Sequence, residues 1–101
     1  MEPWLPSVLA RIHSHARLGQ VQLTEKARRE SRRLGLVLGA DDICEILSAL
    51  DAQEFHASVV SEVDGDTLYI FKPFVYRTRI YVKIAVREIS YLISFHEDDH
   101  A

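Results

Sequence analysis

The sequence predicts a single α+β domain in which three N-terminal helices pack on one face of a four-stranded antiparallel sheet. Apolar residues recur at helical spacing as far as Leu50 and alternate with polar residues after it. The strand-like segments follow one another through short connections, which make neighbouring strands run antiparallel. The chain has 101 residues, of which 48% are hydrophobic, enough to bury one core. We therefore expect residues 1–101 to form one domain.

The first two predicted helices have recognisable ends. Residues 5–19, LPSVLARIHSHARLG, carry apolar side chains at helical spacing, and Gly19 is suited to stop the helix. Residues 23–35, LTEKARRESRRLG, offer Thr24 as N-cap and Gly35 as the residue just past the helix end. The exposed side of this second helix is expected to form a cationic ridge of four arginines: Arg28, Arg29, Arg32 and Arg33. His13 and His15, on the first helix, are expected at the surface.

The third predicted helix spans residues 40–51, ADDICEILSALD, and opens with acids that suit a helix N-terminus. Asp42 and Glu45 resemble a capping box. Cys44 is expected to pack as a small apolar group, and as the single cysteine it cannot form an internal disulfide. With no signal-peptide pattern and no apolar run near the roughly 20 residues that span a bilayer, the sequence predicts a cytoplasmic protein without membrane contact.

The second half of the chain predicts strands and one marked turn. The strand-like segments are FHASVVSEV at 55–63, TLYIFKP at 67–73, RIYVKIAV at 79–86 and ISYLISF at 89–95. Between the first two, the DGD sequence at 64–66 predicts a hairpin with Gly65 at positive φ. Because side chains alternate along a strand, apolar residues of RIYVKIAV meet the helices while Arg79, Tyr81 and Lys83 point to the open face.

The charge pattern bears on what this open face binds. A formal net charge of −3 argues against a simple nucleic-acid-binding domain. Residues 66–96, however, contain five basic and two acidic residues, a local net charge of +3. The row of Arg79, Tyr81 and Lys83 offers cations for phosphates and a ring on which a base can stack. The alternative is a solvated face whose long side chains only keep the sheet soluble.

The last residues match the H-E-x-x-H pattern of zinc peptidases at His96, Glu97 and His100. That pattern binds zinc only on a helix, where the two histidines share a face. The β-branched and aromatic residues leading into it predict a strand instead, and the chain ends before a third ligand. We therefore expect no metal ion or other cofactor, which leaves open what His96 does at the end of the last strand.

Five stretches, in this order, resemble a known family. They are LGQVQLTEKARRESRRLGL, DDICEILSALDAQEFHASV, YIFKP, IYVKIAV and LISFHE. The sequence from about Ile12 to Glu97 is similar to the MqsR family of bacterial type II toxins, messenger-RNA endoribonucleases related in fold to RelE-like toxins. The resemblance implies a RelE-like toxin fold, an mRNA substrate and a cognate antitoxin that commonly has a zinc-binding N-terminal and a DNA-binding C-terminal domain.

The resemblance also implies where the active site lies. The family's catalysis is attributed to two lysines, a glutamine and a tyrosine. The tyrosine matches Tyr81, and the position of the final lysine holds His96. The first lysine position falls on Ala57 and the glutamine position near Leu68, so one of the four residue types is retained.

RNA cleavage without a metal needs a base for the 2′-hydroxyl proton, a cation for the crowded phosphorane and an acid for the leaving 5′-oxygen. Histidine titrates near pH 6.5, so His96 can serve as the acid. His56 is a candidate base, although strand parity points it to the opposite face unless a bulge re-aims it. Tyr81 is the other candidate. The remaining candidates bind phosphate: Lys83, Lys72, Arg77 and Arg79.

Two hypotheses from different classes follow. In the first, the chain is a toxin that cleaves mRNA through a substituted active site. In the second, it is a catalytically weakened or inactive toxin scaffold that acts as a binding or regulatory partner, as the loss of polar groups at Ala57 and Leu68 suggests. The retained row of Arg79, Tyr81 and Lys83 favours the first, because contacts with another protein alone do not need it.

Overall fold

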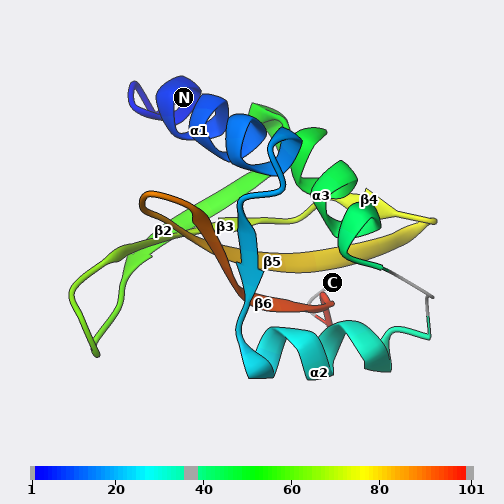
Figure 1. Cartoon of the computed structure of the whole chain (residues 1–101). Coiled ribbons are helices and arrows are strands. Elements are labelled where there is room, and N and C mark those ends of the chain that lie inside the picture. The colour runs from blue at the N-terminus through cyan, green and yellow to red at the C-terminus, as the bar shows by residue number, and fades with distance from the viewer. Residues whose placement is uncertain (1, 36–38, 100–101) are drawn as a thin grey trace.

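A computed structural model describes residues 2–35 and 39–99, which form a mixed β-sheet with helices over one face and along one edge (Figure 1). The α+β class is therefore confirmed. In chain order the elements are α1 (Leu5–Arg17), β1 (Val21–Leu23), α2 (Glu25–Arg33), α3 (Ala40–Ser48), the 3-10 turn η1 (Ala52–Glu54), β2 (Phe55–Val60), β3 (Thr67–Phe71), β4 (Phe74–Val75), β5 (Thr78–Val86) and β6 (Ser90–Glu97). No helix in these residues is long and apolar enough to cross a membrane.

The sheet contains the four expected antiparallel strands and two short additions. The strand order is β1-β6-β5-β3-β2, and β4 pairs with β5. β1 runs parallel to β6, with Val21 opposite Ser90 and Leu23 opposite Leu92, so the sheet is mixed rather than purely antiparallel. The additions are three and two residues long. Segments of this length are too short to display the alternation by which strands are recognised in a sequence.

The core lies between the sheet and the two helices α1 and α3. Ile80, Val82 and Ile84 of β5 are fully buried, as the alternating pattern predicts. They join the buried residues of α1 and α3 in one cluster, which also contains Phe71 of β3 and Phe95 of β6. The other face of β5 is therefore left to Tyr81 and Lys83, which are half-buried.

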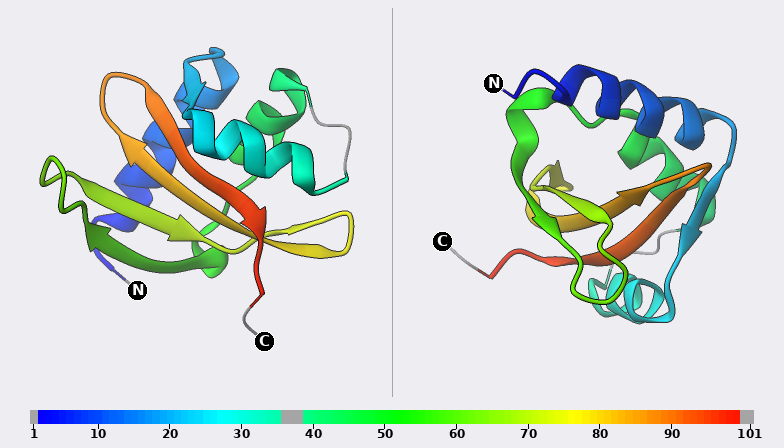
Figure 2. Two further views of the ribbon diagram at one scale, coloured as in Figure 1. Left: turned by 90° about the horizontal axis from the view of Figure 1, so that it is seen from below. Right: turned by 90° about the vertical axis from the view of Figure 1, so that its left-hand side faces the viewer.

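Helix α2 does not join α1 and α3 over the sheet but runs beside β6, at the sheet's edge (Figure 2). Thr24 fixes its start: the Thr24 hydroxyl accepts a hydrogen bond from the Ala27 N–H at 3.1 Å and donates one to the Ile93 carbonyl at 3.2 Å. Ala27 is fully buried. One side chain thus caps the helix and also contacts β6.

We expect Thr24→Ala to lower the free energy of unfolding by about 1 kcal/mol, the usual cost of losing an N-cap. The part-buried hydrogen bond to the Ile93 carbonyl is lost as well, so the loss should not fall at the low end of the range known for such caps. Urea unfolding measures this value. Thr24→Ser, which keeps the hydroxyl, should restore most of it, and equal losses in the two variants would contradict the capping role.

Glycines end the helices and shape the hairpin as predicted. Gly19, Gly35 and Gly65 have φ of 70°, 71° and 75°. The hairpin between β2 and β3 is closed by a hydrogen bond from the Ser61 N–H to the Asp66 carbonyl at 2.8 Å. At the start of α3 the capping box differs from the expected one, because Gly39 is the N-cap and its N–H donates to the Asp42 carboxylate at 2.8 Å.

The expectation that His13 and His15 lie at the surface is wrong for His15. Its Nδ1 lies 2.9 Å from the Ser90 hydroxyl, and the side chain is buried. His13 Nε2 lies 2.6 Å from the Leu50 carbonyl. Cys44 is half-buried, and burial, followed by the nearby Asp41 charge, raises the pKa of its thiol, in keeping with a packing role.

An ion-pair cluster ties the β2-β3 hairpin to the end of β5. The Arg87 guanidinium lies 2.9 Å from the Asp64 carboxylate and also binds Asp66. The Asp66 N–H, chiefly, together with Ser61 and Arg87, holds the pKa of Asp64 below its ordinary value. A depressed carboxyl pKa adds stability above the unfolded-state pKa, and this stability is lost as the pH falls through the folded-state pKa.

Asp64→Asn should therefore lower the Tm slightly at neutral pH, with the difference from wild type shrinking below about pH 4. The effect is small and weakens with added salt because the group is exposed. Thermal melts from pH 6 to pH 2 measure it. A difference in Tm that grows toward acid pH would contradict a lowered pKa of Asp64 in the folded protein.

Candidate active site

The register of β5 and β6 brings His96 onto the row predicted from the sequence. Tyr81 pairs with His96, and Lys83 pairs with Ser94. The Tyr81 and His96 rings are stacked, with centroids 4.8 Å apart and planes 11° from parallel. Lys83 Nζ lies 5.8 Å from the centroid of the Tyr81 ring. The three side chains expected to act together therefore lie on one face of two neighbouring strands.

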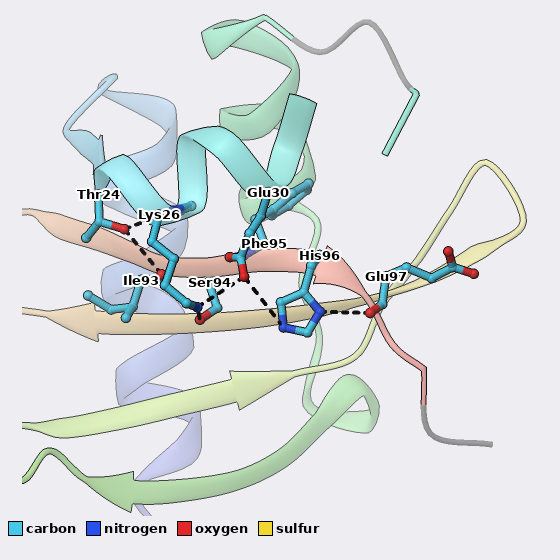
Figure 3. Close-up of polar contacts among 9 residues, drawn as sticks. Thr24, Lys26, Glu30, Ile93, Ser94, Phe95, His96 and Glu97 are labelled. Carbon is cyan, nitrogen blue, oxygen red and sulfur yellow. Dashed lines mark hydrogen bonds and ion pairs between the residues drawn. The ribbon is translucent and has the colours of Figure 1, made fainter. Parts of the chain in front are cut away.

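The hydrogen bond of His96 identifies its titrating nitrogen. His96 Nδ1 lies 2.8 Å from the Glu97 carbonyl oxygen, which can only accept, so Nδ1 carries a proton (Figure 3). Nε2 is then the nitrogen that gains or loses a proton. The side chain is 39% exposed, and Nε2 lies 4.0 Å from Glu30 Oε2 on α2. A substrate can reach this ring, and its reactive nitrogen faces α2.

Lys26 and Glu30 of α2 complete this side of the site, and the sequence does not reveal them. Lys26 Nζ donates to the Ser94 hydroxyl at 2.7 Å and pairs with Glu30 Oε2 at 3.1 Å. Glu30 Oε1 accepts a hydrogen bond from the Phe95 N–H at 3.1 Å. Their spacing of four residues predicts only an ion pair within the helix. Their contacts with β6 arise because α2 docks along that strand.

A cavity of about 290 Å³ joins these groups. It is lined by Lys26, Tyr81, Lys83, Ser94, His96, Asp98 and Asp99. Two ammonium groups and a histidine line this hollow together with two carboxylates, of which that of Asp98 is paired with Lys72. The two ammonium groups and the imidazole are groups that can bind a phosphate. A second cavity of about 340 Å³ also reaches His96, between Glu30, Arg33, Leu34, Glu97 and Asp99.

Lys72 lies on the same face but is already paired. Its Nζ is 3.4 Å from Asp98 Oδ2, and the Asp98 side chain is only 2% exposed. The Asp98 N–H donates to the Arg79 carbonyl at 2.9 Å, which extends the pairing of β5 and β6 by one residue. Asp98 Oδ1 is buried without a hydrogen-bond partner in the described structure. A tail residue that the sequence gives no reason to select therefore neutralises one of the expected phosphate ligands.

His56, Arg77 and Arg79 are not among the described residues that line the cavity. The register of β2 shifts between Phe55 and Ala57, so the bulge that could re-aim His56 is present, but His56 is exposed. Arg77 lies in the β4-β5 turn with φ of 67°. The Arg79 guanidinium covers the Phe74 ring at 4.3 Å. These side chains can meet only parts of a ligand that extend beyond the cavity.

The two positions where polar residues were expected from the family resemblance hold no such group. Ala57 pairs with Ile70, and Ile70 pairs with Lys83, so Ala57 lies on the row of Lys83 but two strands away. Leu68 pairs with Ala85. The polar groups of the site are instead supplied from α2 and the C-terminal residues.

The zinc pattern is not built as a peptidase site requires. His96 and Glu97 lie in β6, where successive side chains point to opposite faces. His100 lies outside the described residues. Among residues 2–35 and 39–99, no three or more His, Cys, Asp or Glu side chains are grouped so that they could hold a metal ion.

A comparison with protein families gives one match over most of the chain. The family model described as "Motility quorum-sensing regulator, toxin of MqsA" matches residues 6–97. No curated protein matches the chain.

Proposed function

This chain belongs to the family of the motility quorum-sensing regulator, toxin of MqsA, and on this premise we propose that it is an endoribonuclease that cleaves mRNA without a metal ion. Membership of the family makes it a toxin of a toxin-antitoxin system, with an antitoxin as its partner. The observation that carries the proposed activity is the cavity in which His96, stacked on Tyr81, faces Lys26 and Lys83.

The chemistry begins with attack of the 2′-oxygen on phosphorus. The bond from phosphorus to the 5′-oxygen breaks, and His96 Nε2–H gives its proton to that oxygen, leaving a 2′,3′-cyclic phosphate and a free 5′-hydroxyl. Tyr81 relays the proton of the 2′-hydroxyl to water. The hydrogen bond from Nδ1 to the Glu97 carbonyl holds the imidazole so that Nε2 is the donating nitrogen.

The cations divide into two groups in this mechanism. Lys83 and Lys26 line the cavity and stabilise the charge that develops on the phosphorane. Arg77 and Arg79 lie beyond the cavity and are exposed, so they contact flanking phosphates of a longer RNA. Lys72 contributes less, because the Asp98 carboxylate already balances its charge.

A second candidate function is binding without turnover. Ala57 and Leu68 stand at positions where the family resemblance predicts catalytic polar groups, and this favours a weakened scaffold that acts as a regulatory partner. In both cases we propose a cytoplasmic setting and an antitoxin with zinc-binding and DNA-binding domains. Any zinc of the complex would then belong to that partner.

Incubation of the purified protein with mixed-sequence RNA in EDTA tests the proposal. Cleavage in EDTA, with cyclic phosphate ends, is the expected result. RNA binding without cleavage in any buffer would contradict the endoribonuclease and support the binding scaffold. Activity that appears only with added zinc, and that is lost again as EDTA is titrated in, would instead support a zinc site.

A further inference from the structure

We propose that a hollow between α3 and the β4-β5 hairpin is a docking site for a partner protein, and that it receives an arginine side chain of that partner. The hollow has a volume of about 240 Å³. Among the described residues, it shares none of its lining with the cavity of Tyr81 and His96. A partner can therefore dock there whether or not the chain cleaves RNA.

The walls of the hollow combine aliphatic and aromatic side chains. Helix α3 lies beside the hairpin (Figure 1) and contributes Ile46 and Ala49, whereas the hairpin contributes Phe74, Val75 and Tyr76. The Phe74 and Tyr76 side chains are 63% and 73% exposed, although both are large and hydrophobic. Exposed aromatic side chains that border a hollow are typical of a surface that contacts another protein.

The turn of the hairpin holds Tyr76 at the hollow in a strained conformation. The pairing of β4 with β5 ends at Val75 and Thr78, so Tyr76 and Arg77 are the two turn residues. Their φ angles are 49° and 67°, whereas a two-residue turn with both φ positive is usually made of Asn and Gly. A bulky side chain disfavours this region of φ. An aromatic residue kept at such a position indicates a role outside the stability of the fold.

Three carboxylates determine the charge of the occupant. Asp42 and Glu45 of α3 and Glu54 of η1 line the hollow, and no basic side chain among the described residues does. Asp42 and Glu54 each accept one hydrogen bond from a backbone N–H at the start of their own element. None of the three carboxylates forms an ion pair with another described residue. The hollow is therefore complementary to a cation.

Arginine fits this combination of groups better than lysine does. Its planar guanidinium can donate paired hydrogen bonds to a carboxylate and can also stack on an aromatic ring. The chain already contains one such stack, because the Arg79 guanidinium lies 4.3 Å from the centroid of the Phe74 ring. Arg79 does not line the hollow in the described part of the chain. The Tyr76 ring and the carboxylates are thus left for an arginine of the partner.

NMR titration of the isotope-labelled full-length protein tests the docking site. The probe is the blocked tripeptide acetyl-Ala-Arg-Ala-amide, and its control carries citrulline, which has nearly the same shape without the charge. The amide signals of Ile46, Ala49, Val75 and Tyr76 should shift with the arginine peptide, with a Kd on the order of 1 mM that rises with added salt. Equal shifts with the citrulline peptide, or shifts confined to the cavity of His96, would overturn the proposal.

Tyr76→Asn separates docking from folding. Asparagine adopts positive φ more readily than tyrosine, so the Tm should stay the same or rise, while the Kd for the arginine peptide should increase about 3-fold to 10-fold. Glu45→Gln should weaken binding by a similar factor with little change in Tm, because Glu45 is exposed. Glu62→Gln removes an exposed carboxylate between β2 and β3 and should bind like wild type. Unchanged affinity in either Tyr76→Asn or Glu45→Gln would overturn the proposal.

A second copy of this chain is the alternative occupant, because the four arginines of α2 are exposed. Sedimentation of the free protein over a range of concentrations distinguishes the two cases. A monomer at every concentration supports a different protein as the partner. Self-association that is lost in both Tyr76→Asn and Glu45→Gln would overturn the proposed partner and assign the hollow to contacts between copies of the chain.

Discussion

Replacement of His96 by alanine should lower the turnover of RNA by about 100-fold to 10,000-fold, the range typical of losing a positioned acid. The affinity for RNA should change far less, because Lys26 and Lys83 remain in the cavity. The wild-type rate should also fall as the pH rises and the imidazolium is lost, since only the charged ring carries a proton on Nε2. Single-turnover cleavage and fluorescence anisotropy measure the two quantities separately.

Two other histidines serve as controls for this result. His56 is exposed and does not line the cavity among the described residues, so His56→Ala should retain most of the activity. His100→Ala should likewise change little. A zinc peptidase pattern requires the opposite, because both histidines of the motif would be indispensable and zinc would bind stoichiometrically. A fully active His96→Ala enzyme would remove His96 from the mechanism and leave Tyr81 with Lys83 as the pair to test.

The features that the sequence predicts correctly are those determined by neighbouring residues. The alternation in β5 places Tyr81 and Lys83 on the open face, and this is observed. Thr24 begins α2, and Gly65 adopts positive φ, because capping and turn geometry depend on a few successive residues.

The features that the sequence does not reveal depend on contacts between distant segments. Docking of α2 beside β6 joins Lys26 to Ser94, which is 68 residues away in the chain. The same holds for buried His15 and its contact with Ser90, 75 residues away. No local pattern encodes these contacts, because each joins segments that lie far apart in the chain. The contribution of Lys26 and Glu30 to the candidate site is therefore visible only in the folded chain.

Replacement of Lys83 by alanine should lower kcat by about 100-fold to 1,000-fold, the usual effect of losing one group that stabilises the transition-state charge. Lys83 is half-buried in the cavity, beside the Tyr81 ring and next to Ser94. Its charge acts where water is partly excluded, which makes it more effective than an exposed lysine. KM should rise less than kcat falls, because the ground-state phosphate carries less charge than the phosphorane.

Lys72→Ala is the matched comparison for this prediction. Lys72 lies on the same face but is paired with the buried Asp98 carboxylate, so its removal should lower kcat much less than that of Lys83. Lys83→Arg, which keeps the charge but changes its geometry, should recover part of the loss. Steady-state kinetics on a short RNA substrate measure all three variants. Equal losses from Lys72→Ala and Lys83→Ala, or a rise in KM alone for Lys83→Ala, would show that the face only attracts RNA and that its lysines do not act on the transition state.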